Sequence, residues 1–282
     1  MNRVLLMLFL LALRSPAQDL LPGPDGFTVR PGFGTKKAIA TGIVGFVFVG
    51  TAADFYFSWW KNSEKPFSFF TEHWLDGSHK GLDKIGHLLG TNTIFKSLRN
   101  TMLWGGYERR TALWTAAGIA MFNAVEIEMG DAFSPYGFDY QDLVFGMMGI
   151  SYGMLQSEIP ALNNFNLKFS YFTNKGFKTP AAFIEDYDAL TIWCSVNVHN
   201  LLPDPARKYW PEFINLALGF GVTENETRRE FLIGIDFNLE AFHTSSEDLL
   251  YAEKILNMTH IPAPAVNWTE GKRVASYGIY VK

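Results

Sequence analysis

The chain has 282 residues, a length that fits one large domain or two ordinary ones. It carries 24 basic and 28 acidic residues, and this acidic balance argues against nucleic acid as a partner. The sequence contains no nucleophile elbow, Walker loop, zincin motif or dinucleotide fingerprint, so the enzyme classes that depend on these motifs are excluded.

The first 17 residues have the pattern of a secretory signal peptide. Arg3 supplies a basic start, Val4 to Leu13 form an apolar stretch, and Ser15-Pro16-Ala17 resembles a cleavage site. The only cysteine, Cys194, is far downstream, so no thiol near that site can carry a lipid. The sequence predicts export to the cell envelope, with an extended segment over residues 18–36.

Residues 37–160 are predicted to form a hydrophobic helical bundle. Its first helix is indicated by 16 uncharged residues from Ala38 to Ala53, between two lysines and the aromatic residues of 54–60. These flanks are typical of a membrane-spanning helix, whereas the glycines inside the stretch also fit a buried core helix. Further apolar stretches cover residues 82–95, 111–125 and 143–156. We expect the bundle to lie in or against a lipid membrane.

Residues 161–282 are predicted to form an antiparallel β region with one short helix. Four segments are rich in β-formers and partly alternate, and two weaker ones raise the count to six. The clear strands cover 166–172, 213–222, 230–240 and 274–281, the weaker ones cover 190–198 and the stretch near Val266, and the helix covers 245–257. The predicted fold class is therefore α+β. An outer-membrane barrel or pore would need eight or more closed strands and is disfavoured by this count.

Charged residues lie at one end of three of these apolar stretches. The second stretch opens with Asp83, Lys84 and His87, and a helix would place Asp83 and His87 on one face. The third ends near Glu126, Glu128 and Asp131, and the fourth begins with Asp139 and Asp142. The question raised by the sequence is whether these groups form one site.

The order and spacing of these residues resemble a known family. Asp83-Lys84-x-x-His87, then Glu128-x-x-Asp131, then Tyr136-Gly137-Phe138 followed by Asp142, resemble YfiM-like bacterial envelope proteins of unknown function. The pattern is also similar to that of VanZ-like membrane proteins. It covers roughly residues 65–160, and departs from those families at Ala132 and Gly146, where they usually have glycine and asparagine. The family implies no reaction.

The strand-rich second half resembles the longer members of that family in Bacteroidetes-type bacteria. This resemblance implies an exported, membrane-associated protein at the outer membrane or the periplasmic face of the cell envelope.

One hypothesis for the charged residues is an enzyme site. A histidine and several carboxylates that converge from three helices could hold a divalent metal, with Asp83, His87, Glu128, Asp131 and Asp142 as ligands. Such a metal could activate water against an ester or phosphoester of a lipid or cell-wall precursor, with Asp83, His87 and Glu128 as the catalytic groups.

The other hypothesis is structural. Lys84 would pair with Glu126 or Glu128, with Glu126 as the expected ion-pair partner, and the carboxylates of Asp83 and Asp139 would cap helices. The leading interpretation is a membrane-associated envelope protein of scaffold or accessory type, whose partners are the lipid membrane and other envelope proteins; the alternative is the metal-assisted hydrolase. Lys84 decides between them, because a lysine that neutralises the carboxylates in a closed pocket leaves no free groups for catalysis.

Overall fold

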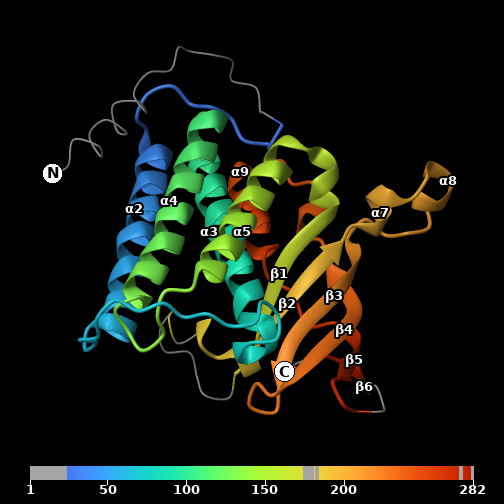
Figure 1. Ribbon diagram of the computed structural model, residues 1–282. Coiled ribbons are helices and arrows are strands. Elements are labelled where there is room, and N and C mark those ends of the chain that lie inside the picture. Colours follow the sequence, from blue (N-terminus) through green and yellow to red (C-terminus); the bar gives the residue numbers. More distant parts are fainter. Residues whose placement is uncertain (1–23, 174–180, 182–183, 273–275, 281–282) are drawn as a thin grey trace.

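The computed structural model describes residues 24–173, 181, 184–272 and 276–280 (Figure 1). Helices occupy the first half of the chain and a six-stranded antiparallel sheet occupies the second, so the predicted α+β fold class is confirmed. The predicted signal peptide lies outside the described residues.

Four long helices form the bundle, and each extends beyond the apolar stretch that predicted it. They are α2 (Thr35–Phe55, continued by the π-helical turn Tyr56–Trp60), α3 (Leu82–Trp104), α4 (Arg109–Asp131) and α5 (Tyr140–Glu158). Helix α3 is central, because it packs against α2, α4 and α5 and also against the short helix α9 (Glu247–Leu256). Phe95, Leu98 and Ile150 lie in the core that α3 shares with α4 and α5.

Helices α3 and α5 approach closely because α5 has glycine at the contact. A Cβ atom on Gly149 would lie only 2.0 Å from the carbonyl oxygen of Leu88. Two polar side chains of α3 form hydrogen bonds to backbone carbonyls of α5 across this close contact. Thr91 Oγ1 donates to the carbonyl of Gly146 at 2.8 Å, and Asn92 Nδ2 donates to the carbonyl of Gly149 at 2.9 Å. Buried polar groups are satisfied in this way across the helix interface.

The sheet is a meander in which each strand pairs with its neighbours in the sequence. Its strands are β1 (Phe165–Tyr171), β2 (Leu190–Val196), β3 (Ile214–Thr223), β4 (Arg228–Phe237), β5 (Pro264–Thr269) and β6 (Ser276–Ile279). The six predicted segments are therefore confirmed as strands. The short helical elements are η2 (Ser78–Gly81), η3 (Pro160–Asn164), η4 (Tyr187–Ala189), α7 (Val198–Leu201), α8 (Asp204–Arg207) and η5 (Leu239–Phe242).

The sheet and the bundle share a core. Leu82 and Leu89 of α3 pack against Leu190 and Ile192 of β2 and Val222 of β3. These apolar contacts join the helical bundle to the sheet. They do not show whether the chain divides into two domains near residue 160, and that division stays a prediction.

The sheet curls until a later segment of the chain reaches its first edge. The backbone N–H of Phe169 in β1 donates to the carbonyl of Met258 at 3.2 Å, and the N–H of His260 donates to the carbonyl of Phe169 at 2.7 Å. The residues from Met258 onward lead directly into β5. The outer edge of β1 therefore has backbone partners at this point, and the concave side of the sheet is enclosed.

Candidate functional site

The charged residues meet at one end of the bundle. The start of α3, the end of α4 and the start of α5 lie together there, and the loop that precedes η2 closes over them (Figure 1). Asp139 accepts a hydrogen bond from the backbone N–H of Gln141 at 2.8 Å and caps α5, as predicted. The predicted cap at Asp83 is wrong. Gly81, in the left-handed region at φ 83°, is the N-cap of α3, and Asp83 lies in its first turn.

Lys84 is the centre of the site. Its side chain is only 1% exposed, and its Nζ lies within 4 Å of four carboxylates. The distances are 2.7 Å to Asp139, 2.8 Å to Asp142, 3.0 Å to Glu72 and 3.5 Å to Asp83. A buried ammonium is stable only with such partners, because desolvation of the charge costs several kcal/mol. Lys84 therefore joins α3, α5 and the loop before η2.

Glu128 of α4 joins this cluster through the backbone. Its side chain is buried, and Oε2 accepts a hydrogen bond from the N–H of Asp139 at 3.0 Å. Asp131, one turn further along α4, accepts a hydrogen bond from Trp60 Nε1 at 2.8 Å. The end of α2 is thereby tied to the end of α4.

His87 lies beside two of the carboxylates. Its Nε2 is 3.7 Å from Asp83 Oδ1 and 3.8 Å from Asp142 Oδ2, and both distances are too long for hydrogen bonds. Asp83 Oδ1 instead accepts a hydrogen bond from the hydroxyl of Tyr187. The imidazole is about one-fifth exposed, so His87 is more accessible than either Asp83 or Asp142.

The excess of carboxylates shifts several pKa values. Burial raises the pKa of Glu128 to about 8 and that of Asp142 to about 6. Burial alone would lower the pKa of His87, but the charges of Asp83, Asp142 and Glu128 raise it. Burial would raise the pKa of Asp83, yet His87, Tyr187 and Lys84 bring it below its usual value. Burial would likewise lower the pKa of Lys84, but its carboxylate partners raise it.

Three of the five predicted metal ligands come together. One ligand atom each from Asp83, His87 and Asp142 lie within 4.8 Å of one another. Metal–ligand bonds of about 2.0–2.2 Å place neighbouring donors roughly 3–4 Å apart, so a small contraction would suit a transition metal or zinc. Glu128 and Asp131 are not in this group, and each has the hydrogen-bond donor described above.

The expected pairing of Lys84 with Glu126 is replaced by other contacts. Lys84 has Glu72, Asp83, Asp139 and Asp142 around it, and Glu126 is on α4 with Oε2 buried and without a hydrogen-bond partner among the described residues. Glu126 and Glu128 are two positions apart on a helix and so point in different directions. Glu128 is the one that faces the cluster.

Two other members of the site, Glu72 and Tyr187, could not be predicted from sequence patterns. Glu72 lies in a polar loop whose path cannot be inferred from periodicity, and Tyr187 comes from η4, more than 100 residues after Asp83. Contacts of such long sequence separation depend on how the sheet docks on α3.

Residues 71–158 match the family model of a predicted periplasmic lipoprotein, DUF2279. The DUF2279 match covers less than half of the chain, yet it includes every charged residue of the cluster from Glu72 to Asp142. No curated protein and no solved structure matches the chain. The similarity to DUF2279 and the apolar helix α2 fit a cell-envelope protein of unknown role. The more specific YfiM-like and VanZ-like resemblances stay predictions.

Proposed function

We propose that this protein is a membrane-anchored accessory or scaffold protein of the cell envelope. In this proposal α2 crosses the lipid bilayer, and the Lys84 cluster at the end of the bundle holds helices, loop and sheet in a fixed arrangement. The observation that carries it is the exposure of α2 in the folded chain.

Helix α2 has the length and surface of a membrane anchor. From Thr35 to Trp60 it runs for 26 residues, roughly 39 Å at 1.5 Å per residue, which exceeds the hydrocarbon thickness of a bilayer. Only 11% of its most apolar stretch is buried inside the protein. A core helix of a water-soluble protein would be mostly buried. Its large exposed side chains are Ile39, Phe46, Val49, Tyr56 and Phe57.

Exposed aromatic residues gather at the end of the bundle where α2 finishes. They come from the end of α2, the loop that follows it and the connection between α4 and α5, and they are Tyr56, Phe57, Phe67, Phe69, Phe70, Trp74, Phe133, Tyr136 and Tyr140. Aromatic side chains are enriched at the boundary between hydrocarbon and water. Their position supports a membrane interface near the Lys84 cluster, with the cluster itself outside the span.

The cysteine content favours a helix as the anchor. The matching family is described as lipoproteins, but the single cysteine of this sequence, Cys194, lies in β2. A thiol within the sheet is not positioned as an N-terminal lipid acceptor. We therefore assign the anchoring role to α2.

The surroundings of Lys84 support a structural role for the cluster. Because the ammonium pairs with Asp139 and Asp142 and also approaches Glu72 and Asp83, these carboxylates have a charged partner within the protein. A satisfied buried network fixes how its parts register against one another.

Membrane extraction tests the proposal. Wild-type protein should stay with membranes after alkaline carbonate washing, whereas the double variant Phe46→Lys and Val49→Lys should be released as folded protein. Trp114 and Val125 are exposed on α4, and a matched double variant there, Trp114→Lys and Val125→Lys, separates loss of the α2 anchor from a general loss of surface apolarity. Release of the wild-type protein by carbonate would refute the proposal.

A second candidate is the metal-assisted hydrolase of a lipid or cell-wall precursor. The grouping of Asp83, His87 and Asp142 within 4.8 Å supports it, since these residues could hold a divalent ion that activates water. The purified protein would then retain metal, and His87→Ala would lose it while His243→Ala, a change of an exposed histidine, would not. Equal metal content in the two variants would leave the structural role as the better account.

A further inference from the structure

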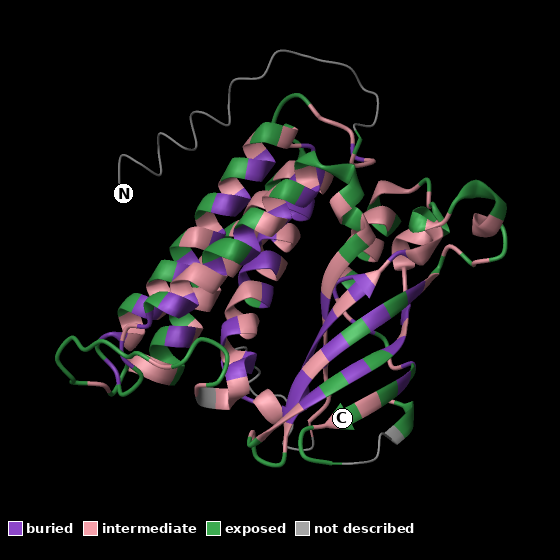
Figure 2. Ribbon diagram, turned by 45° about the vertical axis from the view of Figure 1, so that its right-hand side comes forward, coloured by how far each residue is buried: buried purple, intermediate pink, exposed green. Residues whose placement is uncertain are grey.

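One face of the sheet is only partly covered by the helical bundle. The enclosed concave face carries charged and polar side chains beside a small apolar cluster of Trp193, Ala217, Leu232 and Ala265, whereas the opposite, outer face packs on α3 at β1 and β2 and carries large exposed apolar side chains over β3, β4 and β5. Figure 2 shows the alternation of buried and exposed residues along the strands. Soluble antiparallel sheets usually place their apolar face against the core and their polar face in water.

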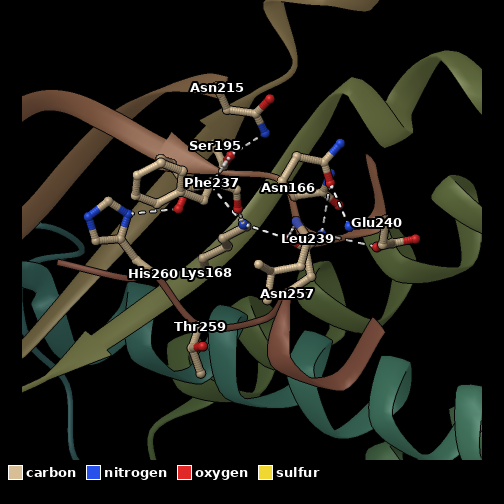
Figure 3. A network of polar contacts seen from close by, with 12 residues as sticks. Asn166, Lys168, Ser195, Asn215, Phe237, Leu239, Glu240, Asn257, Thr259 and His260 are labelled. Atoms are coloured by element: carbon tan, nitrogen blue, oxygen red, sulfur yellow. Dashed lines mark hydrogen bonds and ion pairs between the residues drawn. The ribbon is translucent and has the colours of Figure 1, made fainter. Parts of the chain in front are cut away.

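The concave face is occupied by a connected polar network. Lys168 of β1 lies 2.7 Å from Asp236 of β4, Ser195 of β2 donates to Asp236 at 2.6 Å, and His260 Nδ1 lies 3.0 Å from Asp236. Asn257 accepts a hydrogen bond from Lys168 at 2.8 Å. Figure 3 shows Lys168 and Ser195 of the strands converging with Asn257 and His260 of the segment after α9. The network joins β1, β2, β4 and the segment after α9 on the inside of the curled sheet.

The outer face of β3, β4 and β5 carries apolar side chains in successive rows of cross-strand pairs. In one row Leu218 pairs with Ile233, which pairs with Val266; in the next, Phe231 pairs with Phe220 and Trp268. Cross-strand partners share a face of the sheet, so the side chains of each row lie side by side. Five of these six side chains, all except Phe220, are among the exposed large apolar residues of the protein.

These rows on β3, β4 and β5 form an apolar band. At each end of the band, aromatic residues are followed by charged ones. At the hairpin between β3 and β4, aromatic Phe231 and Trp268 are followed by the charged residues of 224–229. At the opposite end, exposed Tyr209 and Phe213 adjoin the charged helix α8. An apolar band between aromatic and charged layers is the pattern that sheets in contact with lipid display.

The apolar band and α2 lie at a similar level along the direction in which α2 would cross a membrane. Arg229, at the hairpin end, donates hydrogen bonds to the carbonyl of Leu75 and to Asp76, which lie in the loop before η2. The hairpin and the Lys84 cluster are therefore at the same end of the molecule (Figure 1). A strand of ten residues rises roughly 33 Å before tilt, similar to the hydrocarbon thickness. One slab of lipid could cover both α2 and the outer face of the sheet.

We propose that the outer face of β3, β4 and β5 contacts the acyl chains of a lipid bilayer. Lipid explains why the apolar side chains of β3, β4 and β5 lie uncovered, because hydrocarbon stabilises apolar side chains outside while the polar groups stay enclosed. Lipid also requires that backbone groups have partners, and the contact of Met258 and His260 with β1 supplies them at that edge. The inference goes beyond the proposed function, which requires only α2 in the membrane.

Depth-dependent quenching tests this inference on the full chain. In a Cys194→Ser background, single cysteines at Leu218 or Ile233 would carry a fluorescent label, and the protein would be reconstituted in phosphatidylcholine and phosphatidylglycerol vesicles with brominated acyl chains. Val49→Cys on α2 is the control for the anchor, and Thr227→Cys in the hairpin is the control for an aqueous position. The labels at 218 and 233 should lose as much emission as the label at 49, and the label at 227 should lose little.

The outcomes separate the two proposals. Quenching at 49 without quenching at 218 and 233 would overturn the inference and leave the anchor intact. No quenching at any of these positions would refute the anchor as well. Self-quenching between labels at 218 in unbrominated vesicles would show a second copy of the chain on this face, and would also overturn contact with lipid.

Discussion

Lys84 and Asp139 form the innermost ion pair of the candidate site, with 2.7 Å between Nζ and Oδ2 and with side chains that are 1% and 2% exposed. Asp139 is at the same time the cap of α5 and a hydrogen-bond donor, through its backbone N–H, to Glu128 of α4. One residue thus connects three helices of the bundle. The structural role that we assign to the cluster depends on this connection.

Removal of the Lys84 charge should strongly destabilise the fold. Lys84→Met leaves four carboxylates near one another without their ammonium, and loss of one partner of a buried pair costs about 3–5 kcal/mol. Lys80→Met, four residues earlier and at a partly exposed site, should cost less than about 1 kcal/mol. Denaturant unfolding in detergent, followed by circular dichroism, measures both. Similar values for the two variants would contradict the structural role of Lys84.

Stability should fall as the pH rises through the neutral range. The pKa of Glu128 is about 8 in the folded protein against an ordinary 4.5, so the folded state retains a proton that the unfolded chain releases. The resulting stabilisation is complete below about pH 4.5 and is lost as the pH approaches 8. The raised pKa values of Asp142 and His87 act in the same direction, whereas the lowered pKa of Asp83 matters only at more acidic pH.

Glu128→Gln tests this pH dependence. The amide keeps an oxygen that can accept the hydrogen bond from Asp139, but it has no proton to release. The unfolding free energy of the variant should therefore change less between pH 5 and pH 8, by up to about 1.4 kcal/mol per pH unit. Glu64→Gln, in an exposed loop, controls for the loss of a surface charge. A slope identical to that of the wild type would show that Glu128 does not retain the proton.

The contact between α3 and α5 should not tolerate a methyl group at Gly149. A Cβ there would meet the Leu88 carbonyl at 2.0 Å and Thr91 Oγ1 at 2.4 Å, so Gly149→Ala must push the helices apart. Gly118→Ala on α4 meets nothing within 4 Å and should stabilise the helix by up to about 1 kcal/mol. Thermal unfolding of the two variants gives opposite shifts in Tm if this packing is correct. An unchanged Tm for Gly149→Ala would show that the helices are further apart.

Much of the fold could be predicted because its elements have local signals. Apolar stretches marked the four helices, and β-rich segments marked the six strands. The cap at Asp139 was predictable from its position before an apolar stretch, whereas Asp83 follows a glycine that itself takes the capping position. Local pattern alone did not distinguish these two cases.

The composition of the site was only partly predictable. The enzyme hypothesis placed Asp83, His87, Glu128, Asp131 and Asp142 in one site, and the structure brings the ligand atoms of only Asp83, His87 and Asp142 within 4.8 Å of one another. The partners of Lys84 were not predictable, because Glu72 lies in a loop and Asp139 was expected to act only as a cap. The exposed apolar face of β3, β4 and β5 was also not predicted, since alternation in a sequence does not say which side of a sheet is covered.

The most direct test of the central claim is the topology of α2. In a Cys194→Ser background, Thr35→Cys and Asn62→Cys place single thiols at exposed positions on either end of the helix. A membrane-impermeant maleimide should label one of them in sealed membrane vesicles and both after detergent is added. Labelling of both thiols in sealed vesicles of a single orientation would show that α2 does not cross the bilayer, and would contradict the proposed function.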